Sequence, residues 1–169
     1  MDISITSIKE LREQCGAGIM DCRNALIKAE GDMEKALEDL KEMGCLKAAK
    51  KVERATEQGL IESYIHVGGR IGAMVEVNCE TDFVARTDVF KELAHNLAMQ
   101  VAAMCPQYIS EEDIPDDAEV EDVETACLLK QAYIKDQAIT IHDVIVEAIS
   151  KLGENIRISR FTRFELGVR

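Results

Sequence analysis

The spacing of the apolar residues changes from that of helices to that of strands at Gly59. Before this glycine, apolar side chains recur at helical intervals, as in Ile19, Cys22 and Leu26. After it, the residues from Ile71 to Cys79 alternate between apolar and mostly polar, which is the pattern of a half-buried strand. This order predicts a small helical domain followed by a domain that contains a sheet.

Short helices are expected in the first part of the chain. Ser7–Glu10 has the pattern of a capping box, and Gly16 is placed to end the first helix in a left-handed turn. Asp32 is expected to cap a later helix that ends before Gly44. The basic stretch Cys45–Arg54 has high helix propensity and few apolar residues, so it predicts a separate, exposed connecting helix.

The second part begins with a predicted β-hairpin that turns at Gly68-Gly69. Two amphipathic helices are expected, one from Asp88 to Met104 and one that Thr140 caps and Gly153 ends. The stretch Ile156–Leu166 is expected to be a strand, and its broken alternation at Phe161 predicts a bulge or two covered faces. Since two strands alone are marginal, this last strand should complete a three-stranded antiparallel sheet.

The predicted fold class is therefore α+β, with a helical N-terminal domain and a core domain in which helices pack on the sheet. We place the first domain, with its connecting helix, at residues 1–55 and the second at residues 56–169. An acidic segment near residues 110–126 carries no Lys or Arg between Ser110 and Glu124, and we interpret it as a solvated connection.

Charge and length limit the classes of function. The chain has 169 residues and a formal net charge of −12, which repels phosphate backbones and anionic lipids, so we expect neither nucleic acid nor a membrane as partner. No run of ~18 apolar residues suits a membrane span, and Met1–Ser4 lacks the layout of a signal peptide. A protein partner is favoured.

The cysteines are scattered and form no Cys-x-x-Cys pair, unlike those of a zinc site or a secreted scaffold. We interpret them as reduced core residues of a cytoplasmic protein. They are Cys15, Cys22, Cys45, Cys79, Cys105 and Cys127.

Residues that carry chemistry do not gather into a catalytic set. His66, His95 and His142 fall on three different predicted elements. The stretch from Gly68 to Gly72 lacks the spacing of a nucleotide-binding loop. Acidic neighbours of Cys79 would raise the pKa of its thiol, which disfavours a thiolate nucleophile. The sequence thus predicts neither an enzyme nor a cofactor or metal site.

The segment Thr81-Asp82-Phe83-Val84 lies between a predicted strand and a predicted helix, where side chains project outward. One interpretation is structural: Asp82 caps the next helix and Phe83 packs on it as a hydrophobic staple. Composition alone favours that interpretation.

Three stretches resemble the signatures of the elongation factor Ts family. They are Leu11–Cys22 (LREQCGAGIMDC), Val75–Arg86 (VEVNCETDFVAR), and Lys151–Ile156 (KLGENI) followed by Arg160-Phe161. The matches span essentially the whole chain, in order and with consistent spacing.

The resemblance implies a guanine nucleotide exchange factor for elongation factor Tu that acts by binding, with a UBA-like three-helix N-terminal domain. It implies that Arg12, Ile19 and Met20 dock on the GTPase domain. Asp82 and Phe83, within Thr81–Val84, would intrude near the nucleotide and dislodge Mg²⁺. It also implies that Leu152 and Gly153 support this contact.

Some positions depart from the family pattern. Cys15 stands where Thr is usual, and Ile19 and Leu152 replace Met and Ile. The stretch between Pro115 and Cys127 is shorter than the helical insertion of many relatives. Compact members of the family form homodimers, so a homodimer is a hypothesis here, with one dimer engaging two GTPases. Two alternatives remain: a UBA-like adaptor without exchange activity, and an enzyme that uses Cys79.

Overall fold

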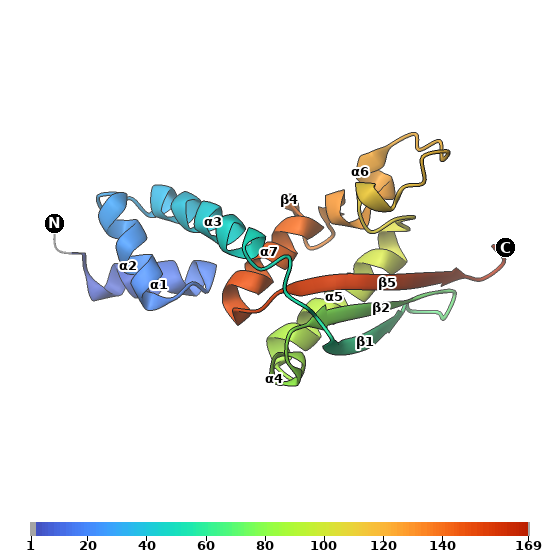
Figure 1. Ribbon diagram of the computed structural model, residues 1–169, viewed down its shortest axis with the longest axis horizontal. Helices are drawn as coiled ribbons and strands as arrows, with labels where there is room; N and C mark the ends of the chain where they lie inside the picture. The colour runs from blue at the N-terminus through green and yellow to red at the C-terminus, as the bar shows by residue number, and fades with distance from the viewer. Residues whose placement is uncertain (1–2, 169) are drawn as a thin grey trace.

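The computed structural model describes residues 3–168, so Met1 and Asp2 of the N-terminus discussed above lie outside the described part. Helices α1 and α2 lie at one end of the molecule, and the end of strand β5 lies at the other (Figure 1). The combination of a helical N-terminal part and an antiparallel sheet with helices confirms the predicted α+β class.

Three helices form the N-terminal part: α1 (Ile5–Cys15), α2 (Ile19–Lys28) and α3 (Met33–Ala49). Ser4, and not Ser7, caps α1, because its side chain accepts a hydrogen bond from the Ser7 amide; the capping box was predicted three residues too late. The three helices enclose a small apolar cluster. Its buried members are Leu11, Cys22, Ala25, Leu26, Ala36 and Leu40.

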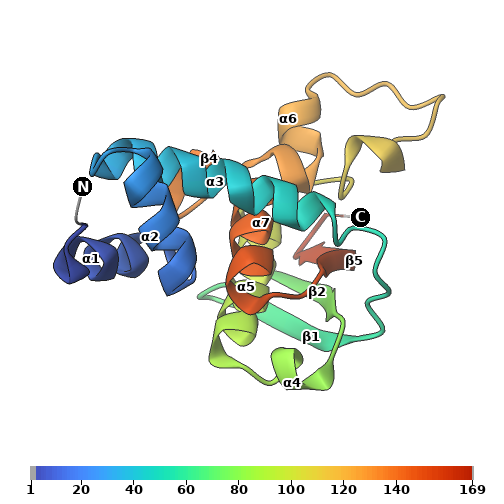
Figure 2. The same ribbon diagram turned by 60° about the vertical axis from the view of Figure 1, so that its left-hand side comes forward.

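Helix α3 continues through Gly44, so the predicted break there and the separate connecting helix Cys45–Arg54 are wrong. Gly44 is buried where α3 passes over α7 (Ile141–Leu152) (Figure 2). A glycine costs a helix interior only about 1 kcal/mol relative to alanine. The burial of Ala48 in the main core favours the continuous helix over a break at this glycine.

The predicted three-stranded antiparallel sheet is confirmed, with strand order β1–β2–β5. Its strands are β1 (Gln58–Ile65), β2 (Ile71–Cys79) and β5 (Ile156–Glu165). The loop between β1 and β2 contains Gly68 and Gly69, both with positive φ (95° and 66°), as the turn prediction requires.

A β-bulge in the last strand explains the broken alternation of its apolar residues. Val77 pairs with Ile158, whereas the preceding Glu76 pairs with Arg160, so Ser159 is the extra residue. Beyond the bulge the alternation is shifted by one residue, and Phe161 packs against the main core. The predicted bulge is confirmed two residues before the position where the pattern breaks.

Helix α5 (Asp88–Met104) packs on one face of the sheet, with α7 beside it. Thr140 caps α7 in a capping box with Asp143, and Gly153 ends the helix with a φ of 77°, as predicted. These elements enclose the main apolar core. Its members without exposed surface include Val75, Val77, Cys79, Phe90, Ala94, Ala98, Val101, Leu128 and Ile141.

A short hairpin that the sequence analysis did not predict precedes α7. Its strands are β3 (Ala132–Tyr133) and β4 (Asp136–Thr140). The buried side chain of Gln100 on α5 holds it, since Nε2 donates to the Ala132 carbonyl (3.1 Å) and Oε1 accepts from the Ile134 amide (3.0 Å). Strands this short leave no periodic pattern in a sequence, which is why the hairpin was missed.

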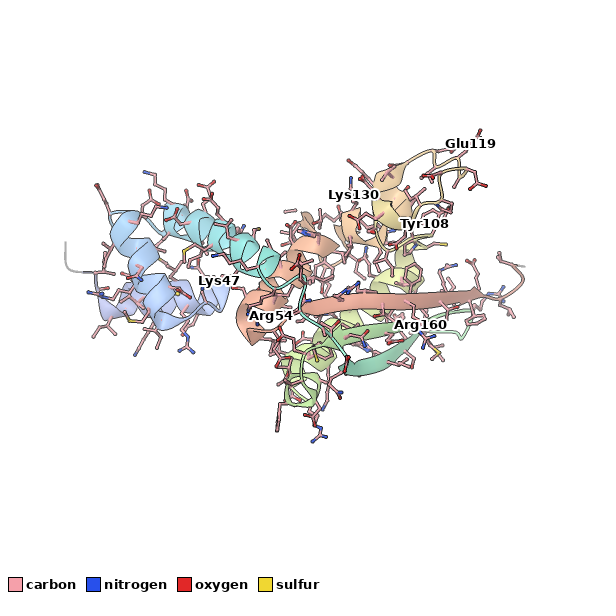
Figure 3. The ribbon with its side chains drawn as sticks, in the orientation of Figure 1. Lys47, Arg54, Tyr108, Glu119, Lys130 and Arg160 are labelled. Carbon is pink, nitrogen blue, oxygen red and sulfur yellow. The ribbon has the colours of Figure 1, made fainter. Side chains whose placement is uncertain are left out.

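The acidic segment is mostly irregular backbone with two short helices, η1 (Glu111–Asp113) and α6 (Val123–Ala126), and η2 (Leu128–Lys130) follows it. All its acidic side chains are exposed, and Glu119 lies near its outer tip (Figure 3). An ion pair joins Glu111, near the start of the segment, to Lys130, which follows its end.

Candidate partner-binding surface

A single helical turn, α4 (Asp82–Ala85), follows the central strand of the sheet. Thr81 caps it: its hydroxyl oxygen accepts a hydrogen bond from the Val84 amide (3.4 Å). Asp82 does not cap the helix but pairs with Arg86 on the next turn, at 2.8 Å. Val84 packs against the main core and anchors the turn from below.

Phe83 projects away from the molecule. Its exposed fraction is 78%, so the interpretation in which it packs as a hydrophobic staple is wrong. An isolated exposed apolar side chain is common on protein surfaces. Phe83, however, sits at the tip of a turn whose other residues are capped, paired or anchored, so the backbone holds the ring in a defined place.

The side chain of Glu154 fixes the entrance to this turn. Its Oε2 accepts hydrogen bonds from the amides of Glu80 (3.1 Å) and Thr81 (2.9 Å), and its Oε1 accepts one from the Thr81 hydroxyl (2.6 Å). In the other direction, the Asn155 amide donates to Glu80 Oε1 at 2.7 Å. The loop after α7 and the loop after β2 therefore hold each other.

Asn155 extends this network to the segment after α3. Its Nδ2 donates to the carbonyls of Val52 (3.2 Å) and Arg54 (2.9 Å), and its side chain is buried. The Arg54 guanidinium in turn donates to Glu80 at 3.4 Å; Figure 3 shows Arg54 at this junction. Sequence reasoning gave no role to Glu80, Glu154 or Asn155. One feature of the sequence could have indicated a role: Glu80 lies in the matched stretch Val75–Arg86, and Glu154 and Asn155 lie in Lys151–Ile156.

The three residues expected to dock on a partner lie at the start of α2 and near the end of α1. Ile19 and Met20 open α2 and are 55% and 60% exposed, although Cys22 and Ala25 in the next turn are buried. Arg12 is exposed in the last turn of α1, next to the buried Leu11. The adjoining ends of α1 and α2 thus present two apolar side chains and one cation to solvent.

The end of α7 lies between this turn and α4 (Figure 1). The Lys151 side chain passes so close to Gly16 that a Cβ there would lie 3.0 Å from Lys151 Cγ. Leu152 is partly buried against the main core, and Gly153 is exposed. We call Arg12, Ile19, Met20, Leu152, Gly153 and Thr81–Val84 the contact surface.

Cys79 is unsuited to act as a nucleophile. It is buried, and its thiol donates to the Thr81 carbonyl at 3.1 Å. Burial, with a smaller contribution from the Glu154 carboxylate, raises the pKa of the Cys79 thiol above its usual range, so the group stays protonated near neutral pH. The thiol contributes to the fold at the base of the contact surface.

The basic end of α3 is used in part within the molecule. Lys47 pairs with Asp21 of α2 at 2.8 Å, which ties the start of α2 to α3 (Figure 3 labels Lys47). Both side chains are partly exposed, so the pair adds about 1 kcal/mol or less. It adds a weak restraint on the helix that carries Ile19 and Met20.

By fold and surface, this is an α+β protein that presents exposed apolar side chains on rigid supports, which is the character of a protein-binding module. Residues 20–122 match the model of the family described as Elongation factor TS. This match covers more than half of the chain, and the protein therefore belongs to the elongation factor Ts family.

Full-length relatives agree with the family match. Elongation factor Ts of Thermotoga neapolitana is 48% identical over 194 aligned positions, which cover 99% of this chain and 98% of that protein. The factor from Desulfosudis oleivorans is 47% identical, with 98% of each chain covered. That from Carboxydothermus hydrogenoformans is 46% identical, with 98% of this chain and 89% of the relative covered.

The length of these alignments exceeds that of the chain. Since 194 positions are aligned against 169 residues, at least 25 positions of the Thermotoga protein have no counterpart here. A shortened stretch between Pro115 and Cys127 would account for such a difference.

In residues 3–168, no helix combines the length and the apolar character needed to cross a membrane.

Proposed function

We propose that this protein is a guanine nucleotide exchange factor for elongation factor Tu. It binds the GDP complex of that GTPase in the cytoplasm, displaces Mg²⁺ and promotes release of GDP, so that GTP can bind during translation elongation. It acts by binding, with no cofactor and no chemistry of its own. Membership of the elongation factor Ts family supports this proposal.

The observation that carries the proposal is the exposed Phe83 on its fixed turn. A phenyl ring that enters a gap between two helices of the GTPase gains about 1.5–3 kcal/mol from burial. Asp82, beside it, brings a carboxylate toward the region where Mg²⁺ bridges the nucleotide and the GTPase. The ring stabilises the displaced arrangement, and the loss of Mg²⁺ removes a large attraction for GDP.

Linkage gives the size and the direction of this effect. Each ~1.4 kcal/mol of coupling weakens nucleotide binding about tenfold. Because coupling is reciprocal, GDP and the exchange factor weaken each other's binding to the GTPase. Excess GTP then refills the empty site and releases the factor.

We assign the remaining contact residues to docking. Ile19 and Met20 supply apolar area, and Arg12 supplies a cation for an acidic group of the GTPase domain. Leu152 and Gly153 support the contact from the end of α7. Two separate groups of contacts, one on the helical part and one on the core, favour a single orientation of the partner.

We also propose that the protein forms a homodimer through the open face of its sheet. On this face Ile65 and Phe164, 71% and 69% exposed, flank Gly72 in register, and Met74 lies in the next row. Its Glu76 pairs with Arg160 at 2.7 Å (Arg160 is labelled in Figure 3). In a chain of net charge −12, an apolar face with a neutralised acid suits contact with a second copy.

A second candidate function is a UBA-like adaptor without exchange activity, which the exposed Ile19 and Met20 favour. An adaptor would use the helical part alone. It would have no use for Phe83 or for the network that holds the turn, so this candidate ranks second.

The decisive experiment follows release of a fluorescent GDP analogue from elongation factor Tu, chased with excess GTP. The wild-type chain should accelerate release at catalytic amounts. Phe83→Ala should reduce the acceleration at least about tenfold, if the buried ring contributes about 1.5 kcal/mol or more. Val67→Ala, at another exposed apolar site, on the hairpin tip, is the matched control and should act like wild type.

Equal acceleration by wild type and Phe83→Ala would move the mechanism to Asp82 or to the helical contacts. No acceleration by the wild type would contradict the exchange function.

Light scattering tests the dimer: the wild type should have twice the monomer mass and Phe164→Glu the monomer mass. A wild-type monomer at working concentration would remove the dimer proposal.

A further inference from the structure

The turn that carries Phe83 has little intrinsic stability. Helix α4 is four residues long, far below the length at which a helix is stable in water by itself. Its place therefore depends on the Thr81 cap, on the anchor at Val84 and on whatever binds the backbone just before it. That backbone is bound by the carboxylate of Glu154, which lies more than seventy residues further along the chain.

Glu154 accepts three hydrogen bonds from two consecutive residues, Glu80 and Thr81, through both of its oxygens. Hydrogen bonds to an ionised acceptor are shorter and about twice as strong as neutral ones. The Thr81 hydroxyl that donates to Glu154 also accepts from the Val84 amide. Glu154 thus fixes both the backbone before α4 and the side chain that caps it.

Asn155 connects the same turn to the helical part of the molecule. It binds Val52 and Arg54, which follow α3, while its own amide binds Glu80. Helix α3 packs on α1 and α2, which carry the docking residues. The separation between Phe83 and the docking residues is therefore set through Asn155 as well as through the core.

From this network we infer that Glu154 is a positioning residue that holds the Thr81–Val84 turn ready for insertion, and that Asn155 links this turn to the docking helices. The inference rests on the proposed exchange function and deepens it. A turn that is already ordered loses little conformational entropy when it inserts into the GTPase. Its order therefore stabilises the complex in which Phe83 is inserted.

The first test separates binding from exchange. For GDP release from elongation factor Tu, Glu154→Ala should lower the maximal rate about tenfold, since losing charge-assisted hydrogen bonds disorders the turn. The half-saturating concentration of the factor should change less than about twofold, because Ile19 and Met20 still dock. Glu154→Gln, which retains one carbonyl acceptor, should recover part of the rate.

Two further variants act as comparisons. Glu112→Gln removes an exposed carboxylate on the acidic segment and should leave both parameters unchanged. Asn155→Ala keeps the main-chain bond to Glu80 but loses the side-chain bonds to Val52 and Arg54. It should raise the half-saturating concentration, because the two groups of contacts then no longer share one geometry.

The second test needs no partner. In the wild type, the amides of Glu80 and Thr81 should exchange slowly with deuterium, and in Glu154→Ala at least about tenfold faster, while amides of the sheet keep their protection. This measurement reports on the turn even if the variant is less stable overall, since sheet amides provide an internal reference.

The outcomes distinguish the inference from the function it rests on. If wild type and Glu154→Ala promote GDP release from elongation factor Tu at the same maximal rate, Glu154 has no positioning role, although the exchange function stands. Unchanged exchange of the Glu80 and Thr81 amides in Glu154→Ala would likewise overturn the inference. If the wild type does not accelerate GDP release from elongation factor Tu, the exchange function is contradicted, and this inference is contradicted with it.

Discussion

The two apolar clusters of the molecule differ in size and in how far along the chain their members lie. The small cluster draws its six buried residues from Leu11 to Leu40, all on three consecutive helices. The main core draws its buried residues from Ala48 to Ile158 and includes all three strands of the larger sheet in its packing. Both carry part of the contact surface. Arg12, Ile19 and Met20 therefore rest on the smaller cluster, whereas Phe83 and Leu152 rest on the larger one.

Helix α3 connects the two clusters, because it contributes buried residues to both. Its Leu40 lies in the small cluster, whereas its Ala48 lies in the main core. Continuity through Gly44 gives the small bundle a rigid attachment. The lesson is that a small helical part can present binding residues in a fixed place when one of its helices is built into a larger core.

The largest expected effect comes from a cavity in the small cluster. Leu26→Ala should cost about 2–5 kcal/mol, a large share of the stability of so small a bundle. Helices α1 and α2 should lose their amide protection at low urea concentration while the sheet stays protected. Ile149→Ala, a similarly buried aliphatic site in the main core, is the matched control and should shift the unfolding of the whole chain.

This pair of variants also tests the predicted domain boundary near residue 55. If Leu26→Ala and Ile149→Ala both give one transition that shifts equally for all amides, the two parts unfold as one unit. The division into residues 1–55 and 56–169 would then be contradicted.

An intermediate effect is expected at alkaline pH. Burial, helped by the neighbouring Cys15, raises the pKa of the Cys22 thiol to about 11. The unfolded chain loses this proton near pH 8.5, whereas the folded chain keeps it. The contribution of this thiol to stability is therefore fully present below about pH 8.5 and is lost as the pH rises to about 11, with a size on the order of 3 kcal/mol.

The measurement is the stability of the helical part from pH 8 to 11, followed by amide protection or urea unfolding. Cys22→Ala removes the group and should flatten the decline in α1 and α2. The buried thiols of Cys79 and Cys127, whose pKa values burial also raises, should still make residues 56–169 less stable as the pH rises. An equally steep decline in Cys22→Ala would refute this assignment.

The smallest effect on stability is expected at the contact surface. Met20→Ser removes a side chain that is mostly exposed, so the free energy of unfolding should change by less than about 0.5 kcal/mol. The affinity for elongation factor Tu should nevertheless fall. A stability loss above about 1 kcal/mol would mean that Met20 serves the bundle and not a partner.

Local patterns in the sequence predicted much of the fold. Gly16 and Gly153 end their helices in the left-handed conformation, and Asp32 and Thr140 cap theirs, as expected from the residue types alone. The presence of the last strand in the sheet followed from the need of a hairpin for a third strand, whereas the central place of β2 was not predicted. These features depend on interactions within a few residues or on a single alternating face, which a sequence displays directly.

Two of the errors share one physical cause. Gly44 looked like a helix end because its propensity is poor, yet packing against α7 keeps the helix intact. Phe83 looked like a staple because a ring next to a helix start usually packs, yet the turn directs it outward. In both cases, contacts with distant parts of the chain overrode a weak local preference.

Sequence patterns alone predicted most of the helices, the caps at Asp32 and Thr140, the hairpin, the bulged last strand and the family. Only the folded structure revealed which residues hold the contact surface in place by hydrogen bonds. Glu154 and Asn155 reach Thr81, Glu80, Val52 and Arg54 across long stretches of chain, and hydrogen bonds of that kind follow no period. Their donors and acceptors meet only once the core has closed, because packing brings the three loops together.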